Sequence, residues 1–176
     1  MGLFSKKKTQ QKSGFSTSTS EFGKGINSKS QSFDDLMNEF ESLGKDKAID
    51  LCFEIVSKTI DKLNDKQLLG YTLFMFWSVS VDGKLTEEEF LITEPVFKII
   101  LKEEDVSYEF ARGYVGGISH RDAIEYGMKT TRIAKDLLSE LDRETAKDVL
   151  MTGVLLSACD GQICDEERAF LKTIIY

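Results

Sequence analysis

The sequence has little proline, histidine or cysteine. Of its 176 residues one is Pro, one is His and three are Cys. Long segments without proline suit helices joined by short turns. A single His leaves few ligands for a structural zinc site. Three Cys without an export signal fit a reducing compartment, in which thiols pack as small apolar groups.

The sequence also lacks a long hydrophobic run. No segment is long and apolar enough to span a bilayer, and the first residues do not form the apolar part of a secretory signal. We therefore expect a cytoplasmic protein. Its hydrophobic content of 41%, with 12 Phe, is sufficient for a core.

The sequence shows no evident strand, no phosphate-binding loop and none of the residue spacings that are typical of a catalytic nucleophile. We therefore do not expect an enzyme.

Negative charge is scarce at the N-terminus and abundant elsewhere. Residues 1–32 contain six Lys and only Glu21 as an acid, so with a total of -7 the remaining residues carry about -12. An acidic body disfavours nucleic acid as a partner.

The first 32 residues are rich in Ser, Thr, Lys, Gln and Gly, a composition that predicts a disordered tail. Gly2-Leu3-Phe4 followed by Lys6-Lys7-Lys8 predicts a weak peripheral contact of residues 1–12 with an anionic membrane. The alternative is a solvated tail that aids solubility.

Helical spacing of apolar residues begins at Phe33 and continues to the end of the chain. It predicts a single all-α domain over residues 33–176, a bundle of seven or eight helices. After a short helical set formed by Phe33, Leu36, Met37 and Phe40, the predicted helices span residues 46–63, 66–81, 87–101, 103–114, 120–138, 143–159 and 165–175. The helix over 66–81 is almost wholly apolar and must lie at the centre, and Pro95 predicts a kink or restart in the helix over 87–101.

One pattern occurs twice, at residues 80–89 and 158–167. Each copy follows an apolar helix, turns at Asp-Gly, passes one aliphatic residue and opens an acidic helix. Asp82 corresponds to Asp160, and Glu88-Glu89 to Glu166-Glu167. The repeat predicts two helix pairs related by an approximate twofold axis, with the central helices in contact.

Helix capping is one explanation of the repeat. Gly is favoured just past a helix end, and Thr86 with Glu89 forms a capping box for the next helix. Leu85 and Ile163 then fill the corners between helices. Acids in the first turn also interact favourably with the helix dipole.

Cation binding is the other explanation. Asp82 and Asp160 follow helix C-termini, where a carboxylate is unfavourable, and Cys164 is a poor cap although the acids around it are kept. The pattern is the second half of an EF-hand calcium loop, but Ser78, Ser80, Leu156 and Ala158 stand where the first ligands would be, which excludes a true EF-hand. We expect calcium rather than magnesium, bound weakly with a dissociation constant on the order of 10⁻⁴ to 10⁻³ M. The candidate ligands are Asp82, Glu88, Glu89, Asp160, Glu166 and Glu167.

The two Asp-Gly turns, carried by residues 77–91 and 155–171, resemble those of the tellurite-resistance protein TerB family. The resemblance extends over residues 45–176, and the start Gly-Leu-Phe-Ser-Lys is also similar. It implies an all-helical fold with a pseudo-twofold axis, no catalysis, and divalent cations bound by the same six acids. Cys164 departs from the family pattern, where Ser or Thr is the cap.

The resemblance further implies a cytoplasmic role in tellurite resistance or stress response, as part of a membrane-associated complex with protein partners. An alternative is a helical protein-interaction module, similar to the TerB-like domain of some membrane-anchored DnaJ-type co-chaperones. In that case the acidic face binds a partner, and any metal is incidental.

Overall fold

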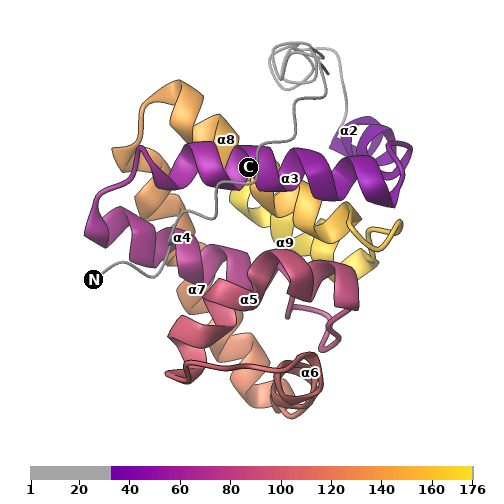
Figure 1. The fold of residues 1–176 in the computed structure, drawn as a ribbon. Helices are drawn as coiled ribbons and strands as arrows, with labels where there is room; N and C mark the ends of the chain where they lie inside the picture. Colours follow the sequence, from indigo (N-terminus) through magenta and orange to yellow (C-terminus); the bar gives the residue numbers. More distant parts are fainter. Residues whose placement is uncertain (1–32, 176) are drawn as a thin grey trace, which may run out of the picture.

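In the computed structural model, which describes residues 33–175, the chain is all-helical. The expected tail over residues 1–32 and the C-terminal Tyr176 lie outside the described residues. The described part forms eight helices and no strand (Figure 1). The helices are α2 (Phe33–Glu41), α3 (Lys45–Ile60), α4 (Asp65–Ser78), α5 (Glu87–Leu101), α6 (Tyr108–Gly116), α7 (His120–Glu140), α8 (Arg143–Ala158) and α9 (Asp165–Ile175).

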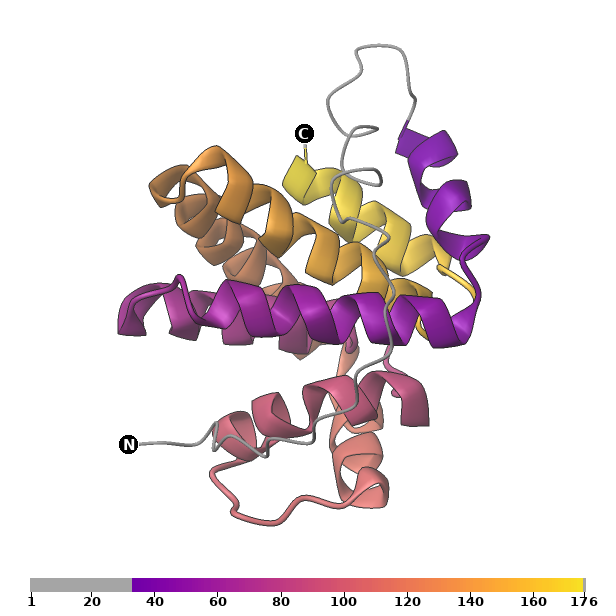
Figure 2. The same ribbon diagram turned by 45° about the horizontal axis from the view of Figure 1, so that its top comes forward.

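The centre of the bundle is formed by α4 and α8, the helices that precede the two Asp-Gly turns. They pack against each other, and each also contacts a long neighbour, α7 for α4 and α3 for α8. Every residue from Met151 to Ala158 in α8 is buried. In α4 the residues from Phe74 to Ser78 are also buried, so the prediction that the apolar helix over 66–81 lies at the centre is confirmed. In two views α2 and α6 lie at opposite ends of the bundle (Figures 1 and 2).

A glycine allows the close approach of the two central helices. A Cβ atom added to Gly153 in α8 would lie 2.5 Å from Cζ of Phe74 in α4 and 3.1 Å from Cδ2 of Leu171 in α9. Phe74 is fully buried at this crossing and its ring is 6.1 Å from that of Phe170. The close packing of α4 against α8 thus requires glycine at position 153.

The predicted helix boundaries are largely confirmed, with one clear error. Residues 103–107 were expected to be helical, but α6 begins only at Tyr108. The left-handed conformation of Lys102 (φ 58°) ends α5, and Ser107 caps α6 by accepting a hydrogen bond from the Phe110 N–H. The chain therefore uses 103–107 as a connection.

The helix does not restart at Pro95, because α5 runs from Glu87 to Leu101 with Pro95 inside it. Proline leaves the carbonyl of Leu91, four residues earlier, without its helical partner. Leu91 is exposed. Solvent on that side can hydrogen-bond the free carbonyl, so the helix continues.

None of the helices between residues 33 and 175 combines the length and the hydropathy needed to cross a bilayer.

We predict opposite effects of alanine at two helical glycines. Gly153→Ala places a methyl group inside contact distance of Phe74 and should lower the free energy of unfolding by about 1–3 kcal/mol. Among the described residues no atom lies within 4 Å of a Cβ added to Gly113 in α6, so Gly113→Ala should raise the free energy of unfolding by about 0.5–1 kcal/mol. Urea unfolding measures both. Equal stability of the two variants would contradict the close crossing of α4 and α8.

Candidate functional site

The two Asp-Gly turns have the same local geometry. Asp82 Oδ1 accepts a hydrogen bond from the Lys84 N–H at 2.8 Å, and Asp160 Oδ1 accepts one from the Gln162 N–H at 2.8 Å. Gly83 and Gly161, with φ of 75° and 93°, supply the left-handed residue that such turns require. The repeat seen in the sequence is therefore a repeat in structure.

Helix caps follow each turn, as the capping explanation predicts for the first copy. Glu89 Oε2 accepts hydrogen bonds from the N–H and the hydroxyl of Thr86, both at 2.8 Å, and Thr86 Oγ1 accepts one from the Glu89 N–H. In the second copy Glu167 Oε2 accepts the Cys164 N–H at 2.8 Å. Half of the capping box therefore survives without a hydroxyl at residue 164.

Both capping glutamates are buried, with only 5% of Glu89 and 6% of Glu167 exposed. The expected corner residues Leu85 and Ile163 are buried beside them. Among residues 33–175 the ion pairs include neither glutamate. In the part of the chain that the structure describes, each carboxyl group thus accepts hydrogen bonds but has no ion-pair partner.

Burial and mutual repulsion change the protonation of these acids. Burial raises the pKa of Glu89 to about 8, and the charges of Glu167 and Asp160 add to the shift. Burial likewise raises the pKa of Glu167 to about 7, with contributions from Asp82 and Asp160. Protonation of both groups therefore changes near neutral pH.

The acids of one copy interact with those of the other. Burial is the main cause that raises the pKa of Asp82, and the nearby charge of Glu166 adds to it. Asp160 acts in the same direction on Glu89. Each turn Asp therefore lies near the first helical turn of the opposite copy. This reciprocal placement joins the two turns into one acidic centre, formed by Asp82, Glu89, Asp160, Glu166 and Glu167.

Glu88 is held differently from the other candidates. Its Oε1 lies 3.0 Å from Lys45 Nζ, and its own backbone N–H and Lys45 lower the pKa of Glu88. Glu88 and, more weakly, Asp160 raise the pKa of Lys45. The ammonium group of Lys45 is thus a cation placed between the two copies, which the sequence pattern did not indicate.

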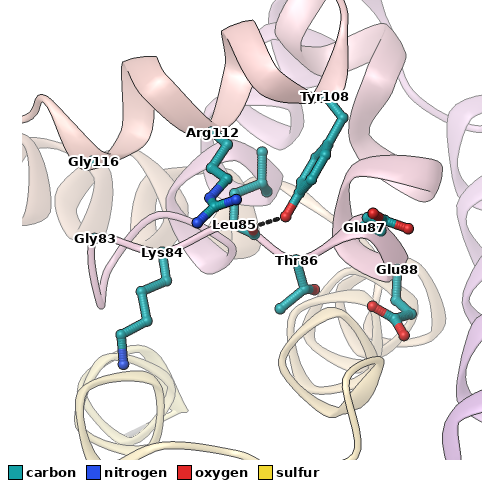
Figure 3. Close-up of a pocket in the computed structure, with 9 residues that line it drawn as sticks. All are labelled: Gly83, Lys84, Leu85, Thr86, Glu87, Glu88, Tyr108, Arg112 and Gly116. Carbon is teal, nitrogen blue, oxygen red and sulfur yellow. Dashed lines mark hydrogen bonds between the residues drawn. The ribbon is translucent and has the colours of Figure 1, made fainter.

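Different helices support the two turns. In Figure 3 the Tyr108 side chain of α6 reaches the first turn, where its hydroxyl donates a hydrogen bond to the Leu85 carbonyl at 2.9 Å, and Arg112 lies beside it. A cleft of about 690 Å³ lies there. It is lined by Gly83, Lys84, Leu85, Thr86, Glu87, Glu88, Tyr108, Arg112 and Gly116.

At the second turn the supporting helix is α2. Glu41 Oε1 accepts the Ile163 N–H at 2.8 Å, and Glu41 Oε2 lies 2.8 Å from Arg168 Nη2. Arg168 Nε donates to the Ile163 carbonyl at 3.2 Å, the position equivalent to Leu85. Neither Glu41 nor Tyr108 belongs to the repeated pattern, and no local signal identified them.

The donor atoms of the acidic centre are of the type that binds a divalent cation, but they are not arranged as a complete coordination shell. Its side chains offer the hard oxygen ligands that calcium and magnesium prefer. The buried Ser80 hydroxyl, two residues before Asp82, has no hydrogen-bond partner among residues 33–175. Within residues 33–175, however, no three His, Cys, Asp or Glu side chains stand close enough together to hold a metal ion. A bound cation would need water, carbonyl groups or a local movement.

Comparison of the chain with models of protein families, with curated proteins and with solved structures finds no match.

We predict that stability falls as the pH rises through neutrality. The folded pKa of Glu89 is about 8 and that of Glu167 about 7, both above the ordinary glutamate value of 4.5, so the folded state holds these protons more tightly than the unfolded state. Their contribution is complete below pH 4.5 and is lost progressively up to about pH 8, on the order of 8 kcal/mol in total at about 1.36 kcal/mol for each unit of pKa difference.

Urea unfolding between pH 5.5 and 8.5 in EDTA measures the loss. In this range Glu88, whose pKa is lowered, stays ionised. Glu89→Gln with Glu167→Gln keeps the acceptor oxygens and should flatten the dependence. A slope unchanged in this double variant would assign the effect to other groups.

Proposed function

We propose that the protein is a non-enzymatic, divalent-cation-binding protein of TerB type. The observation that carries the proposal is the pair of buried glutamates, Glu89 and Glu167, which repel each other without an ion pair in the described residues. A cation between the two turns would offset this repulsion where protons no longer do, above about pH 8 for Glu89.

The six acids have unequal roles in this proposal. Asp82 and Asp160 are half-buried and lead the turns, and Glu166 is exposed beside Asp82. Glu88 would have to leave Lys45 to reach a cation. We therefore place the main ligands at the two aspartates and at Glu89 and Glu167, with water completing the shell. So few ligands per turn support weak binding and a preference for calcium.

The biological part of the proposal rests on the resemblance of the two turns to the TerB family. We place the protein in the cytoplasm, in a stress response such as tellurite resistance, where it joins protein partners in a membrane-associated complex. Cation binding at the acidic centre would then reduce the negative charge of the surface to which a partner binds.

A specific observation favours the alternative, a protein-interaction module in which metal is incidental. The hydrogen bonds to Glu89 and Glu167 already satisfy both helix starts without a cation. Glu87, Asp165 and Glu166 are exposed at these starts and form an acidic face. A partner that binds this face equally in calcium and in EDTA would favour the alternative.

We predict that calcium stabilises the native chain and that the effect depends on pH. At pH 8.5, calcium at about ten times the dissociation constant should add about 1.4 kcal/mol, a rise of a few degrees in the melting temperature. At pH 5.5 the rise should nearly vanish, because Glu89 and Glu167 are protonated there. Calorimetric titration and thermal unfolding measure binding and stability.

The matched variants remove the same charge at different places. Asp82→Asn with Asp160→Asn should abolish the calcium effect. Asp50→Asn with Asp61→Asn, both exposed and outside the turns, should preserve it. If calcium stabilised the native chain and both double variants equally, cation binding at the two turns would be contradicted.

A further inference from the structure

A groove lies between α7 and α9, next to the first acidic turn. Its volume is about 1230 Å³. Its α7 wall is a stripe at helical spacing, Ala123, Ile124, Gly127, Met128 and Thr131. Its α9 wall is Ala169, Phe170 and Thr173, and Trp77 of α4 lies between the two walls.

The groove exposes apolar side chains that have room for an occupant. Met128 is 71% exposed and Ile124 54% exposed. A Cβ atom added to Gly127 would lie 3.2 Å from the Trp77 ring, so the glycine allows α7 to pack closely against Trp77. Large apolar groups placed together on a surface mark a binding site more often than scattered ones do.

Opposite charges lie toward the two ends of the groove. Asp82 and Glu166 line it near the starts of α7 and α9. Arg132, Lys135 and Asp136 line it farther along α7. An occupant that fits has an apolar anchor beside Met128 and cations directed at Asp82 and Glu166.

Residues 1–12 of this chain have that chemistry. Leu3 and Phe4 are an apolar pair, and Lys6, Lys7 and Lys8 follow within about 14 Å of extended chain. Residues 1–32 carry six Lys and a single Glu21, whereas the remainder of the chain is strongly acidic. Charge complementarity therefore favours this segment.

The point of attachment also favours it. The described chain begins at α2, which is fixed to the start of α9 by the ion pair of Glu41 with Arg168. A helix of 9 residues is about 14 Å long, and 32 residues span up to about 105 Å when extended. The segment can reach the groove, and its tether gives it an effective concentration of about 1 mM.

We propose that the groove between α7 and α9 binds residues 1–12 of the same chain, with Leu3 and Phe4 against Met128 and Ile124 and with Lys6–Lys8 toward Asp82 and Glu166. The lysines then occupy the acids that the proposed cation site uses in part. The docking itself does not require a metal, and it is tested in EDTA.

The experiment compares amide NMR spectra of isotope-labelled full-length chains. Leu3→Ser with Phe4→Ser should shift the groove signals of Ala123, Gly127 and Ala169. Unlabelled peptide 1–12 added to this variant should restore the native positions. Phe15→Ser with Phe22→Ser is the matched control, because it removes apolar side chains from the same N-terminal region but outside the docking segment, and it should leave the signals unchanged.

Variants of the groove test the other side. Met128→Lys should weaken binding of peptide 1–12 at least tenfold and Glu166→Gln several-fold, both measured on the Leu3→Ser, Phe4→Ser chain. Leu91→Lys changes an exposed apolar residue outside the groove and should have no effect. Native circular dichroism of each variant confirms folding.

Three outcomes would overturn the proposal. The first is groove signals that do not respond to the Leu3 and Phe4 substitutions. The second is a response that depends on protein concentration, which would assign the groove to a second copy of the chain. The third is a peptide that binds anionic vesicles but not the Leu3→Ser, Phe4→Ser chain. Loss of calcium binding with docking intact would instead contradict only the proposed function.

Discussion

The close packing of α4 against α8 is the constraint on which the acidic centre depends. Gly153 lets the helices meet at Phe74, and each helix leads directly into an Asp-Gly turn. The turns are therefore brought together by the core and not by attraction between them. Because their acids repel one another, the energy of apolar burial must exceed this repulsion in the folded chain.

Much of the fold follows from the sequence pattern. The apolar stretch around Phe74 requires a central helix, and the capping pair of Thr86 and Glu89 marks the start of α5 at the correct residue. The start of α6 could not be found in this way. It depends on the left-handed conformation of Lys102 and on the Ser107 cap, which are weak signals in the sequence. The acidic residues 103–105 resemble the first turn of a helix, so the predicted start was too early.

The candidate site was only partly predictable. Spacing identified the Asp residues and the capping Glu residues of both turns. It could not identify Lys45 or Glu41, because they lie on helices far away in sequence that reach the turns only in three dimensions. It also could not show the burial of Glu89 and Glu167, since the acidic first turn of an amphipathic helix usually faces solvent.

The different supports of the two turns have a mechanical consequence. The carbonyl of Leu85 is hydrogen-bonded by Tyr108 from α6, whereas that of Ile163 is hydrogen-bonded by Arg168, which is itself tied to α2. The second turn is thus tied to α2 through Glu41, whereas the first turn is tied to α6 through Tyr108. Two turns of the same local geometry are consequently coupled to different helices, an asymmetry that the repeat alone would not give.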